Sequence, residues 1–563
     1  MGSETTDNND LVDLPNPDST VVEDRINSIL ERVDKLNKIG IALSSEKDTS
    51  RLLESILVGA KELTNADAGT MYIRTENDTL RFEIIRTDSL NIAMGGTTGI
   101  TINFPELPLY KDGVPNKQMI AAYVALEERS INIPDAYEAK GFDFSGTKAF
   151  DSNTGYRSKS FLTVPLKNHE NEIIGVLQLI NAIDANSGEI RSFSQEDQQL
   201  AESLSSQAAI AMTNQKLITD LKALFESFIQ AIAGAIDDKS PYTAGHCDRV
   251  PVLADMLSKA AKRSNIGELK DFTPDEEDIY EIRIAAWMHD CGKVVTPEYV
   301  VDKSTKLETI YDRIETVSTR FEVLKRDAEI AFLQKKIALL EAGKSEDIPA
   351  LEDELKRRIG EINEDRKFIE ESNMGGEFMS KERQERVVNI ANYRWTDPSG
   401  EEKPFLSENE VYNLNIAKGT LTPEEREIIN HHVVATKKML STIPFPKNLK
   451  NVPEMAGSHH ETMIGTGYPD GLTREQMSIP ARIMAIADVF EALTAADRPY
   501  KKPKSLSESL KILGFMKKDQ HVDPDLFQVF IDEKVYLEYA EKHLRPDQID
   551  EVIHEKIPGY EPQ

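Results

Sequence analysis

The sequence predicts an α+β domain followed by an all-α domain that carries an inserted helical hairpin. Within residues 21–215, short runs rich in β-branched residues alternate with helical segments, which is typical of an α+β domain. From about Leu221 to Gln563 the pattern is almost entirely helical. Inside that second part, a heptad-like apolar stretch is followed by a break and another helix, which indicates the hairpin.

Composition limits the class of protein. The 563 residues exceed what one hydrophobic core supports, so two or three domains are expected. Hydrophobic residues make up 39% of the chain, and no apolar run approaches the roughly 18 residues that a membrane span needs. The two cysteines, Cys247 and Cys291, are too few for a disulfide framework and fit a reducing compartment. We therefore expect a cytoplasmic protein without a membrane segment.

The charge of the chain restricts its ligands. A formal net charge of -30 opposes a nucleic-acid polymer as partner, because binding to phosphates in a row relies on a basic surface and released counterions. A small anionic substrate is compatible with this charge, provided that the site supplies local positive charge from metal ions or a few Lys and Arg side chains.

The first domain is predicted from alternating helices and strands. Residues 1–20 are polar and acidic and are predicted to be disordered. Two helices follow, and a long helix starts near Ser194, where Ser-Gln-Glu-Asp resembles a capping signal. The predicted helices and strands are, in order, Val21–Leu43, Thr49–Leu63, Gly69–Ile73, Leu80–Arg86, Ser160–Pro165 and Glu172–Asn181. The long helix continues through a linker at residues 216–240. Its apolar spacing predicts a parallel homodimer, and an intramolecular core stripe is the alternative.

The second domain is predicted to span residues 241–563, with an insertion at residues 305–404. Apolar residues three and four apart form a seam that predicts one helix of the insertion. These residues are Leu307, Ile310, Ile314, Val317, Phe321 and Leu324. After a break at Gly343–Pro349, a second helix follows, and the polar stretch Asn373–Pro404 is predicted to be a loop. An arm that binds a partner is the alternative to a hairpin within the domain.

Six of the ten histidines fall into four short motifs. The motifs are TAGHCDRV with His246, MHDCGK with His289, INHHVV with His431 and His432, and SHHETMIGTGYP with His459 and His460. Asp488 follows in IADVFEAL. Imidazole is the commonest ligand of transition metals, and carboxylates bridge pairs of ions. Because a helical bundle can gather distant segments around one core, these motifs predict a metal site.

The residue types also indicate the metal and the reaction. Neither cysteine belongs to a Cys-x-x-Cys pair, which argues against a structural zinc site. Nitrogen and oxygen ligands in this number favour iron or manganese over tetrahedral zinc. Two divalent ions roughly 3.5–4 Å apart bind a phosphoryl oxygen, lower the pKa of a shared water and stabilise a leaving oxygen. Hydrolysis of a phosphodiester uses all three effects.

The first domain resembles a GAF domain. The matching residues are VLQLINAID (176–184) and FSQEDQQLAESLSSQAAIAMTNQ (193–215). The resemblance implies a sensor domain, assigned here to residues 21–215, that binds a small molecule and signals along its exit helix. Members that bind cyclic nucleotides carry Asn-Lys-x-Asp, whereas this chain has Asn181-Ala182-Ile183-Asp184. A dimerising module without a ligand remains the alternative.

The second domain resembles the HD-GYP domains, a branch of the HD phosphohydrolases that cleave cyclic di-GMP. The resemblance rests on five motifs in the order of the family: His289-Asp290 with Gly292 and Lys293, His459-His460-Glu461, Gly467-Tyr468-Pro469, ARIMAIADVFEAL, and RPYKK at 498–502. It implies a two-metal phosphodiesterase that hydrolyses cyclic di-GMP to the linear dinucleotide, to GMP, or to both. The implied metal ligands are His246, His289, Asp290, His432, His459, His460 and Asp488, and Asp290 would bridge the two ions. His432 is preferred to His431.

The same resemblance implies residues that contact the substrate. Lys293 lies three residues after Asp290, so its ammonium can point back at the metal-bound phosphate, and these two residues are the expected catalytic pair. Tyr468 is expected to offer a ring on which guanine stacks. Arg498 and Lys501 are expected to supply cationic contacts to the dinucleotide.

Two departures from the family pattern bear on these expectations. Some members hold a third metal with a glutamate four residues before the first histidine, where this chain has Tyr242. The family usually has an aromatic-Asp-Gly run where this chain has Met463-Ile464-Gly465, which keeps another substrate open. The alternatives are therefore hydrolysis of another cyclic dinucleotide, such as a mixed GMP-AMP compound, or of a nucleotide monoester, and a receptor that binds the dinucleotide without cutting it.

Overall fold

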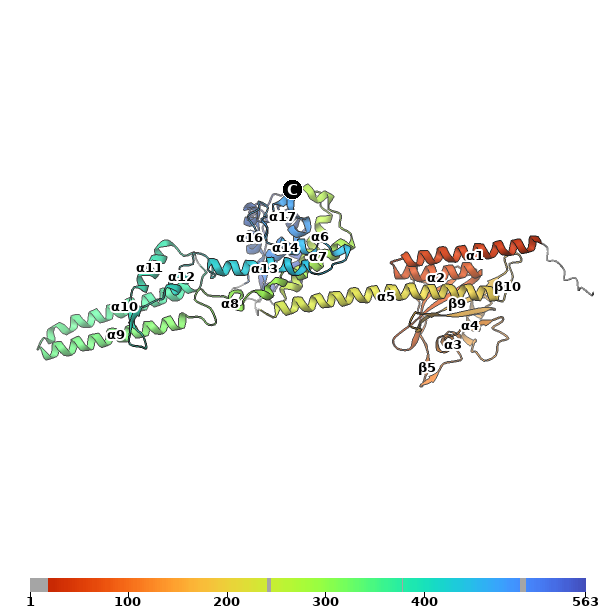
Figure 1. Ribbon diagram of the computed structural model, residues 1–563, viewed down its shortest axis with the longest axis horizontal. Helices are drawn as coiled ribbons and strands as arrows, with labels where there is room; N and C mark the ends of the chain where they lie inside the picture. The colour runs from red at the N-terminus through yellow and green to blue at the C-terminus, as the bar shows by residue number, and fades with distance from the viewer. Residues whose placement is uncertain (1–18, 240–244, 377, 497–502, 563) are drawn as a thin grey trace, which may run out of the picture. The chain divides into compact units, whose positions relative to one another are not determined.

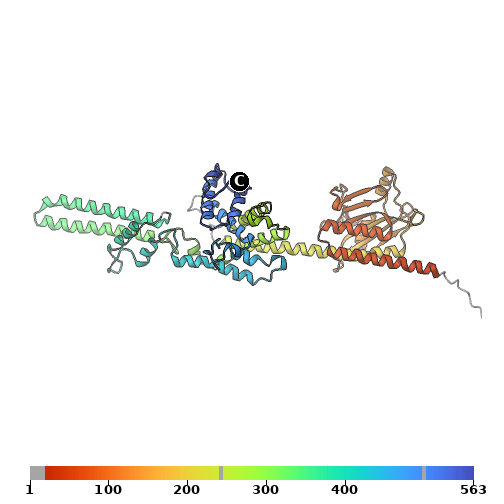
Figure 2. The same cartoon turned by 90° about the horizontal axis from the view of Figure 1, so that it is seen from above.

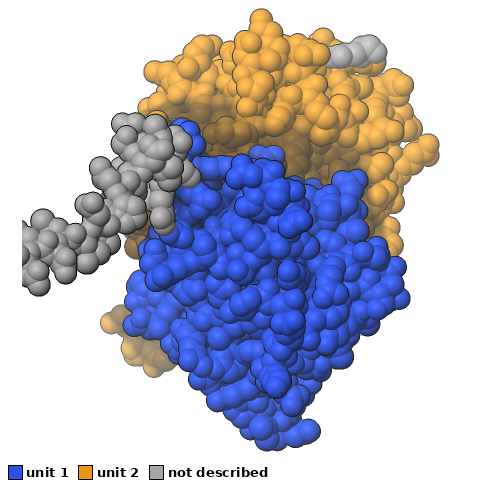
Figure 3. All heavy atoms as spheres, turned by 90° about the vertical axis from the view of Figure 1, so that its right-hand side faces the viewer, with its two compact units in different colours: residues 1–223 blue, residues 224–563 orange. Residues whose placement is uncertain are grey.

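The computed structural model describes residues 19–239, 245–376, 378–496 and 503–562. They belong to two compact units, residues 1–223 and 224–563, which Figure 3 colours separately. The sequence predicted disorder for residues 1–20. Residues 1–18 lie outside the described residues, and residues 19 and 20 begin a helix.

An antiparallel sheet forms the middle layer of the first unit. Its strands follow the order β3-β2-β1-β9-β8-β7, with β4 paired to β2 and β10 paired to β9. The strands are β1 Ala66–Arg74, β2 Thr79–Thr87, β3 Ile92–Gly95, β4 Leu107–Pro108, β7 Ile131–Ile133, β8 Phe161–Lys167, β9 Ile173–Ile183 and β10 Ile190–Arg191. A separate ribbon pairs β5 (Tyr110–Lys111) with β6 (Val114–Pro115). The four strands predicted from sequence correspond to β1, β2, β8 and β9.

Helices cover both faces of the sheet (Figure 1). On one face lie α1 (Ser19–Ser45), α2 (Thr49–Thr64) and the first part of α5 (Gln195–Asp237), around a core that includes Leu57, Met71 and Leu204. On the other face, α3 (Ile120–Glu127) packs on Tyr72, and α4 (Ser145–Thr154) lies nearby. Successive strand residues point to opposite faces, which is why the neighbours Met71 and Tyr72 belong to different cores. The prediction of an α+β domain is confirmed.

In the run Asn181-Ala182-Ile183-Asp184, the two polar side chains form hydrogen bonds with nearby backbone groups. The Asn181 side chain accepts hydrogen bonds from the amides of Lys159 and Ser160 and donates one to the carbonyl of Arg157. Asp184 accepts from the backbone and the hydroxyl of Ser187 in the following turn. These contacts order the chain at the start of β8 and the turn after β9.

Helix α5 begins where the sequence predicted. The carboxylate of Asp197 accepts from the Ser194 amide, while the Ser194 hydroxyl accepts from the Asp197 amide, which satisfies free donors at the helix start. The helix then runs without a break to Asp237 and contributes residues to both units. Among the described residues, no helix combines the length and the apolar character needed to cross a bilayer.

The second unit is a bundle of helices around one large core that includes Leu253, Ile284 and Phe530. Its helices are α6 His246–Lys262, α7 Glu276–Met288, α8 Glu298–Val301, α13 Pro423–Ser441, α14 Val452–Gly457, α15 Ile479–Thr494, α16 Leu506–Lys518, α17 Pro524–Asp532 and α18 Val535–His543. A 3₁₀ turn, η3 (Cys291–Val295), follows α7 and packs on α13. The prediction of a mostly helical second domain is confirmed.

An insertion with its own core separates α8 from α13. Helices α9 (Ile314–Glu341) and α10 (Ile348–Asn373) lie side by side in Figures 1 and 2. They are followed by α11 (Lys381–Ala391), the strand pair β11 (Arg394–Thr396) and β12 (Glu402–Pro404), and α12 (Glu408–Leu414). Buried Phe321, Ile362 and Phe405 belong to the core of the insertion.

Two details of the predicted insertion were wrong. Leu307 and Ile310 were placed on the helical seam, but α9 begins at Ile314 and Ile310 is 96% exposed. There the Glu308 carboxylate accepts from the Ser304 amide and hydroxyl, a local bond that competes with the helical backbone. The stretch Asn373–Pro404, predicted as a loop, contains α11, whose first turn is capped by the Ser380 hydroxyl.

Candidate metal centre

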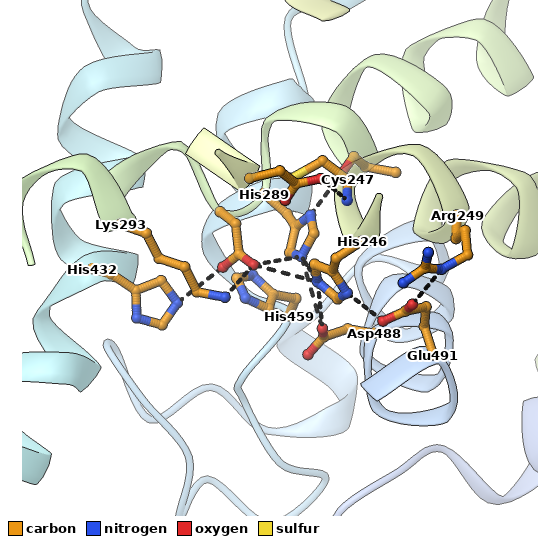
Figure 4. Close-up of polar contacts among 12 residues, drawn as sticks. His246, Cys247, Arg249, His289, Lys293, His432, His459, Asp488 and Glu491 are labelled. Atoms are coloured by element: carbon orange, nitrogen blue, oxygen red, sulfur yellow. Dashed lines mark hydrogen bonds and ion pairs between the residues drawn. The ribbon is translucent and has the colours of Figure 1, made fainter. Parts of the chain in front are cut away.

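Side chains from five separate segments meet inside the second unit (Figure 4). His246 begins α6, His289 follows the last residue of α7, and Asp290 precedes η3. His432 lies on α13, and Asp488 lies on α15. His459 and His460 come just after α14. The structure thus brings together all seven residues that the sequence predicted as metal ligands.

The first group of ligand atoms surrounds His246. Its Nε2 lies 3.2 Å from His289 Nε2, 3.4 Å from Asp290 Oδ2 and 3.3 Å from Asp488 Oδ1. His289 Nε2 lies 3.3 Å from the same Asp290 oxygen. All four residues are buried or nearly so, so the atoms converge in a region from which water is mostly excluded.

The second group consists of His432, His459 and His460, whose candidate ligand atoms lie within 4.8 Å of one another. Asp290 links the groups. Its Oδ1 lies 3.3 Å from His432 Nε2, while its Oδ2 faces His246 and His289. One carboxylate therefore offers an oxygen to each group, as a ligand that bridges two ions does.

Backbone carbonyls fix the orientation of three imidazoles. The Nδ1 atoms of His289, His432 and His459 lie 2.7, 2.5 and 2.7 Å from the carbonyl oxygens of the residues three positions earlier. An Nδ1–H that donates to a carbonyl leaves a lone pair on Nε2, which is the form that binds metals. In all three rings this Nε2 faces the centre of the cluster.

Two of these nitrogens indicate that the cluster fits metal ions. The Nε2 atoms of His432 and His459 are buried and have no hydrogen-bond partner among the described residues. Leaving a buried acceptor unpaired costs about 1–3 kcal/mol, so such atoms usually have a ligand. A divalent cation satisfies lone pairs of nitrogen together with carboxylate oxygens, and the donor set here is of that kind.

The electrostatics of the cluster also suit a cation. Burial opposes ionisation of Asp290, but the charges of Lys293 and His289 outweigh it and hold the pKa of Asp290 well below its usual range. Burial, followed by the neighbouring His460, lowers the pKa of His459 well below that of free histidine. Burial also lowers the pKa of His460 to about 4. His459 and His460 are therefore neutral, whereas the charge of Asp290 outweighs burial at His289 and raises its pKa to about 9.

Lys293 lies at the edge of the cluster on η3. Its ammonium lies 2.5 Å from Asp290 Oδ2. Burial opposes its protonation, but the charge of Asp290 outweighs burial and raises the pKa of Lys293, so this side chain stays cationic. About a quarter of the side chain (23%) is exposed.

A glycine allows η3 to lie close to α13. A Cβ added at Gly292 would lie 1.9 Å from the carbonyl oxygen of His432, which no side chain tolerates. The Gly292 amide donates to the Thr436 hydroxyl, and that hydroxyl donates to the carbonyl of His289. This contact fixes the distance between the segment of His289 and Asp290 and the helix of His432.

Glu491 is a site residue that the sequence reasoning missed. It lies one helical turn after Asp488, is 1% exposed, and contacts the Nδ1 atom of His246 (Figure 4). Its other oxygen accepts a 2.7 Å hydrogen bond from Arg249 Nε. A carboxylate on the far nitrogen of a histidine fixes the ring and its tautomer. The position of Glu491 one turn from Asp488 was the available signal.

The loop that carries Tyr468 is held by Glu461. This fully buried carboxylate accepts hydrogen bonds from the amides of Asp470, Gly471 and Leu472. The Tyr468 ring lies 5.0 Å from the His460 ring at an interplanar angle of 32°. One face of Tyr468 is thus directed at the candidate ligand His460.

Other predicted residues have different surroundings. His431, not chosen as a ligand, is exposed, whereas His432 is buried. Arg498, Lys501 and Tyr242 lie outside the described residues. In the run that differs from the family pattern, Met463 packs with Met477 and Ala481, while Ile464 is exposed. Both cysteines are buried, and burial raises the pKa of Cys291 to about 11.

Family models identify both domains. Residues 48–212 match the GAF domain, and residues 408–526 match the HD domain. The chain therefore contains a GAF domain and an HD domain, as the motifs predicted. The HD match includes His432, His459, His460 and Asp488, whereas His246, His289 and Asp290 precede it.

Several curated relatives are named as phosphodiesterases of cyclic dinucleotides. The 3'3'-cGAMP-specific phosphodiesterase 1 of Vibrio cholerae serotype O1 is 38% identical over 113 residues, which is 20% of this chain and 25% of that protein. A cyclic di-GMP phosphodiesterase of Thermotoga maritima is 30% identical over 227 residues, 38% of this chain and 58% of that protein. One from Pseudomonas aeruginosa is 36% identical over 113 residues, 20% of this chain and 26% of that protein. The chain thus spans between a quarter and three fifths of these relatives.

Proposed function

We propose that this protein is a metal-dependent phosphodiesterase that hydrolyses cyclic di-GMP to the linear dinucleotide, to GMP, or to both, under control of its GAF domain. The observation that supports this best is the position of Asp290, whose two oxygens face two groups of buried imidazoles. The activities named for the relatives from Thermotoga maritima and Pseudomonas aeruginosa agree with this proposal.

The cofactor of the proposal is a pair of divalent ions, iron or manganese. The residues that would hold them are His246, His289, Asp290, His432, His459, His460 and Asp488. Nitrogen and oxygen donors in this number favour these two metals over tetrahedral zinc. Such ions would neutralise charge on a phosphate and lower the pKa of water, which is the chemistry that phosphodiester cleavage requires.

The remaining side chains would bind and orient the dinucleotide. Lys293 keeps its charge beside Asp290 and is partly exposed, so it can contact a phosphate oxygen of the substrate. Tyr468, held by the loop that Glu461 orders, would offer its free face to a guanine base. Arg498 and Lys501 belong to the proposal on the resemblance of their RPYKK motif alone.

Two other functions remain candidates. Hydrolysis of a mixed GMP-AMP cyclic dinucleotide is favoured by the relative from Vibrio cholerae and by the loop in which Ile464 is 51% exposed. A receptor that does not cut the dinucleotide is the other candidate. The buried His289–Asp290 pair counts against it, since binding alone has little need of two groups of metal ligands.

A homodimer is part of the proposal, because α5 exposes an apolar stripe. Leu217, Leu221, Leu224 and Phe228 are each more than half exposed, and their spacing alternates between four and three residues. This spacing matches a coiled-coil seam, and we propose that two copies of α5 would pair along it in parallel. Such a dimer would let a small molecule bound by the GAF domain act on the HD domain through one helix.

The test measures metal content and turnover together. Full-length protein is loaded anaerobically with iron or manganese and incubated with cyclic di-GMP and with the mixed GMP-AMP compound. Turnover of either is expected, and Asp290→Asn should abolish it together with metal binding. Asp550→Asn is the control. It changes a carboxylate that accepts hydrogen bonds from Ser505 and Ser507, and it should keep both turnover and metal binding. Metal-replete protein that binds the dinucleotide without turnover would refute the enzyme and favour the receptor.

A further inference from the structure

A small cavity in the insertion lies beside a buried lysine. It has a volume of about 250 Å³ and is lined by Lys306, Glu371, Ser372, Gly375 and Arg383, among others. These residues come from the segment before α9, the end of α10, the turn after it, and α11 (Figure 1). The cavity shares no lining residue with the candidate metal centre.

Lys306 brings an unbalanced charge to this cavity. The residue is 1% exposed, and its ammonium donates a 3.0 Å hydrogen bond to the carbonyl of Leu414. Within the part of the chain that the structure describes, no carboxylate lies within ion-pair distance of it. A buried cation without a counter-charge is costly, and proteins usually pair it. Burial, followed by the charge of Arg383, lowers the pKa of Lys306 to about 8.

Two nearby cations, the buried Lys303 and the half-buried Arg320, are paired with carboxylates. The Lys303 ammonium lies 2.7 Å from a carboxylate oxygen of Glu425, and the Arg320 guanidinium donates two hydrogen bonds to Glu410. Lys303 precedes Lys306 by only three residues. The sequence thus supplies carboxylates for neighbouring cations and leaves Lys306 with a carbonyl.

Arg383 adds a second cation to the same cavity. Its guanidinium lies over the Phe368 ring at 5.0 Å and is 3.5 Å from the Ser372 hydroxyl. For this side chain too, the described residues provide no carboxylate partner. Glu371 is the described carboxylate of the lining, and it is exposed and 3.9 Å from Lys367. Two cations and a hydroxyl therefore converge on the cavity.

The turn that closes the cavity requires glycine. Gly375 has a φ of +67°, and an added Cβ would lie 2.7 Å from Thr420 Cγ2 and 3.0 Å from the Gly419 carbonyl oxygen. Backbone without a side chain therefore forms this wall. The contact also joins the cavity to the loop before α13, the helix of His432.

We propose that this cavity binds a phosphate-sized oxyanion between Lys306 and Arg383, either inorganic phosphate or the phosphate group of a mononucleotide. The Lys306 ammonium would act as a point charge, and the Arg383 guanidinium can hold two oxygens at once. Ser372 can donate its hydroxyl proton. This site does not depend on the proposed phosphodiesterase activity, because none of its residues belongs to the metal centre.

The test is a calorimetric titration of the full-length protein after chelators have removed metal ions. Inorganic phosphate is one titrant and guanosine 5'-monophosphate is the other. Lys306→Met and Arg383→Gln should each weaken binding roughly ten- to a hundredfold, as loss of a charged hydrogen bond does. Lys335→Met, which removes an exposed lysine of α9, should leave binding unchanged. Tighter binding of the nucleotide than of phosphate would identify the nucleotide as the source.

A further variant addresses an internal counter-charge. Glu377 lies outside the described residues and is close in sequence to Gly375. If the wild-type protein binds no phosphate and Glu377→Gln does, the cavity is neutralised by the chain itself and the proposal is overturned. Equal binding by the wild-type, Lys306→Met and Arg383→Gln proteins would overturn it as well. Melting temperatures of all variants verify that they are folded.

Discussion

Replacing Glu491 by Gln tests whether contacts beyond the ligands set the affinity of the metal centre. The carboxylate contacts His246 through one oxygen and Arg249 through the other. Burial opposes its ionisation, but the hydrogen bond from His246 and the charges of His246 and Arg249 outweigh burial and lower its pKa. It is therefore ionised at neutral pH. The amide keeps the volume of the side chain but loses the charge and one acceptor oxygen.

The size of the effect follows from that geometry. A lost hydrogen bond to the far nitrogen of a histidine ligand lowers metal affinity about 10- to 100-fold. This corresponds to about 1.4–2.8 kcal/mol of binding free energy. We expect the full effect, because Glu491 is almost fully buried and, with the carboxylate gone, water is poorly placed to replace it. The affinity is measured by titrating manganese against a fluorescent chelator.

Glu410→Gln is the matched control for this measurement. Glu410 is also buried and binds an arginine, Arg320, through hydrogen bonds of 2.8 and 3.0 Å, but it lies in the insertion. Both variants should lower the free energy of unfolding of the metal-free protein, whereas Glu491→Gln alone should lower metal affinity. Unchanged affinity in Glu491→Gln, or an equal loss in Glu410→Gln, would refute the reasoning.

Two further predictions concern single side chains. His432→Ala should reduce the bound metal from two ions to one by elemental analysis, whereas His431→Ala, at an exposed position, should keep both; equal losses would contradict the assignment. Because the pKa of Lys306 is about 8 in the fold and 10.5 in a free lysine, the unfolded chain binds more protons between these values. The free energy of unfolding of the wild type should therefore rise with pH over this window relative to Lys306→Met; parallel curves in urea titrations would disprove it.

Elements with a buried stripe could be predicted from sequence, and elements on the surface could not. β9 was predicted because Glu172–Asn181 is an apolar, β-branched run, and it forms the centre of the sheet. In α11, by contrast, only Val387 and Ile390 are buried, so its pattern is that of a polar loop. Periodicity alone extends the helical seam back to Leu307. Local hydrogen bonds at Glu308 instead keep the residues before Ile314 outside helix α9.

The same distinction holds for the candidate site. Histidines in pairs are rare enough to predict a metal site, and the resemblance to the HD-GYP domains then implied the seven ligand residues. Glu491 was missed because a glutamate in a helix usually faces solvent, and burial is a property of the fold. The role of Glu461 was missed as well, because the three amides that it binds come nine to eleven residues later in a loop.

The metal centre and the cavity of the insertion have one feature in common: each contains a buried polar group for which the described residues provide no suitable partner. Other buried charges of the second unit have partners: Arg482 pairs with Asp523, and the Glu461 carboxylate accepts hydrogen bonds from three backbone amides. At the metal centre the unmatched atoms are lone pairs of His432 and His459, which call for a cation. In the insertion the unmatched group is the Lys306 ammonium, which calls for an anion. A buried neutral hydroxyl such as that of Ser258 also lacks a partner, but it carries no net charge that a ligand must balance. The chemistry of the unmatched group therefore distinguishes the two proposed ligand sites from ordinary imperfections of the core: imidazole lone pairs beside an ionised carboxylate favour a cation, and an ammonium without a carboxylate favours an anion.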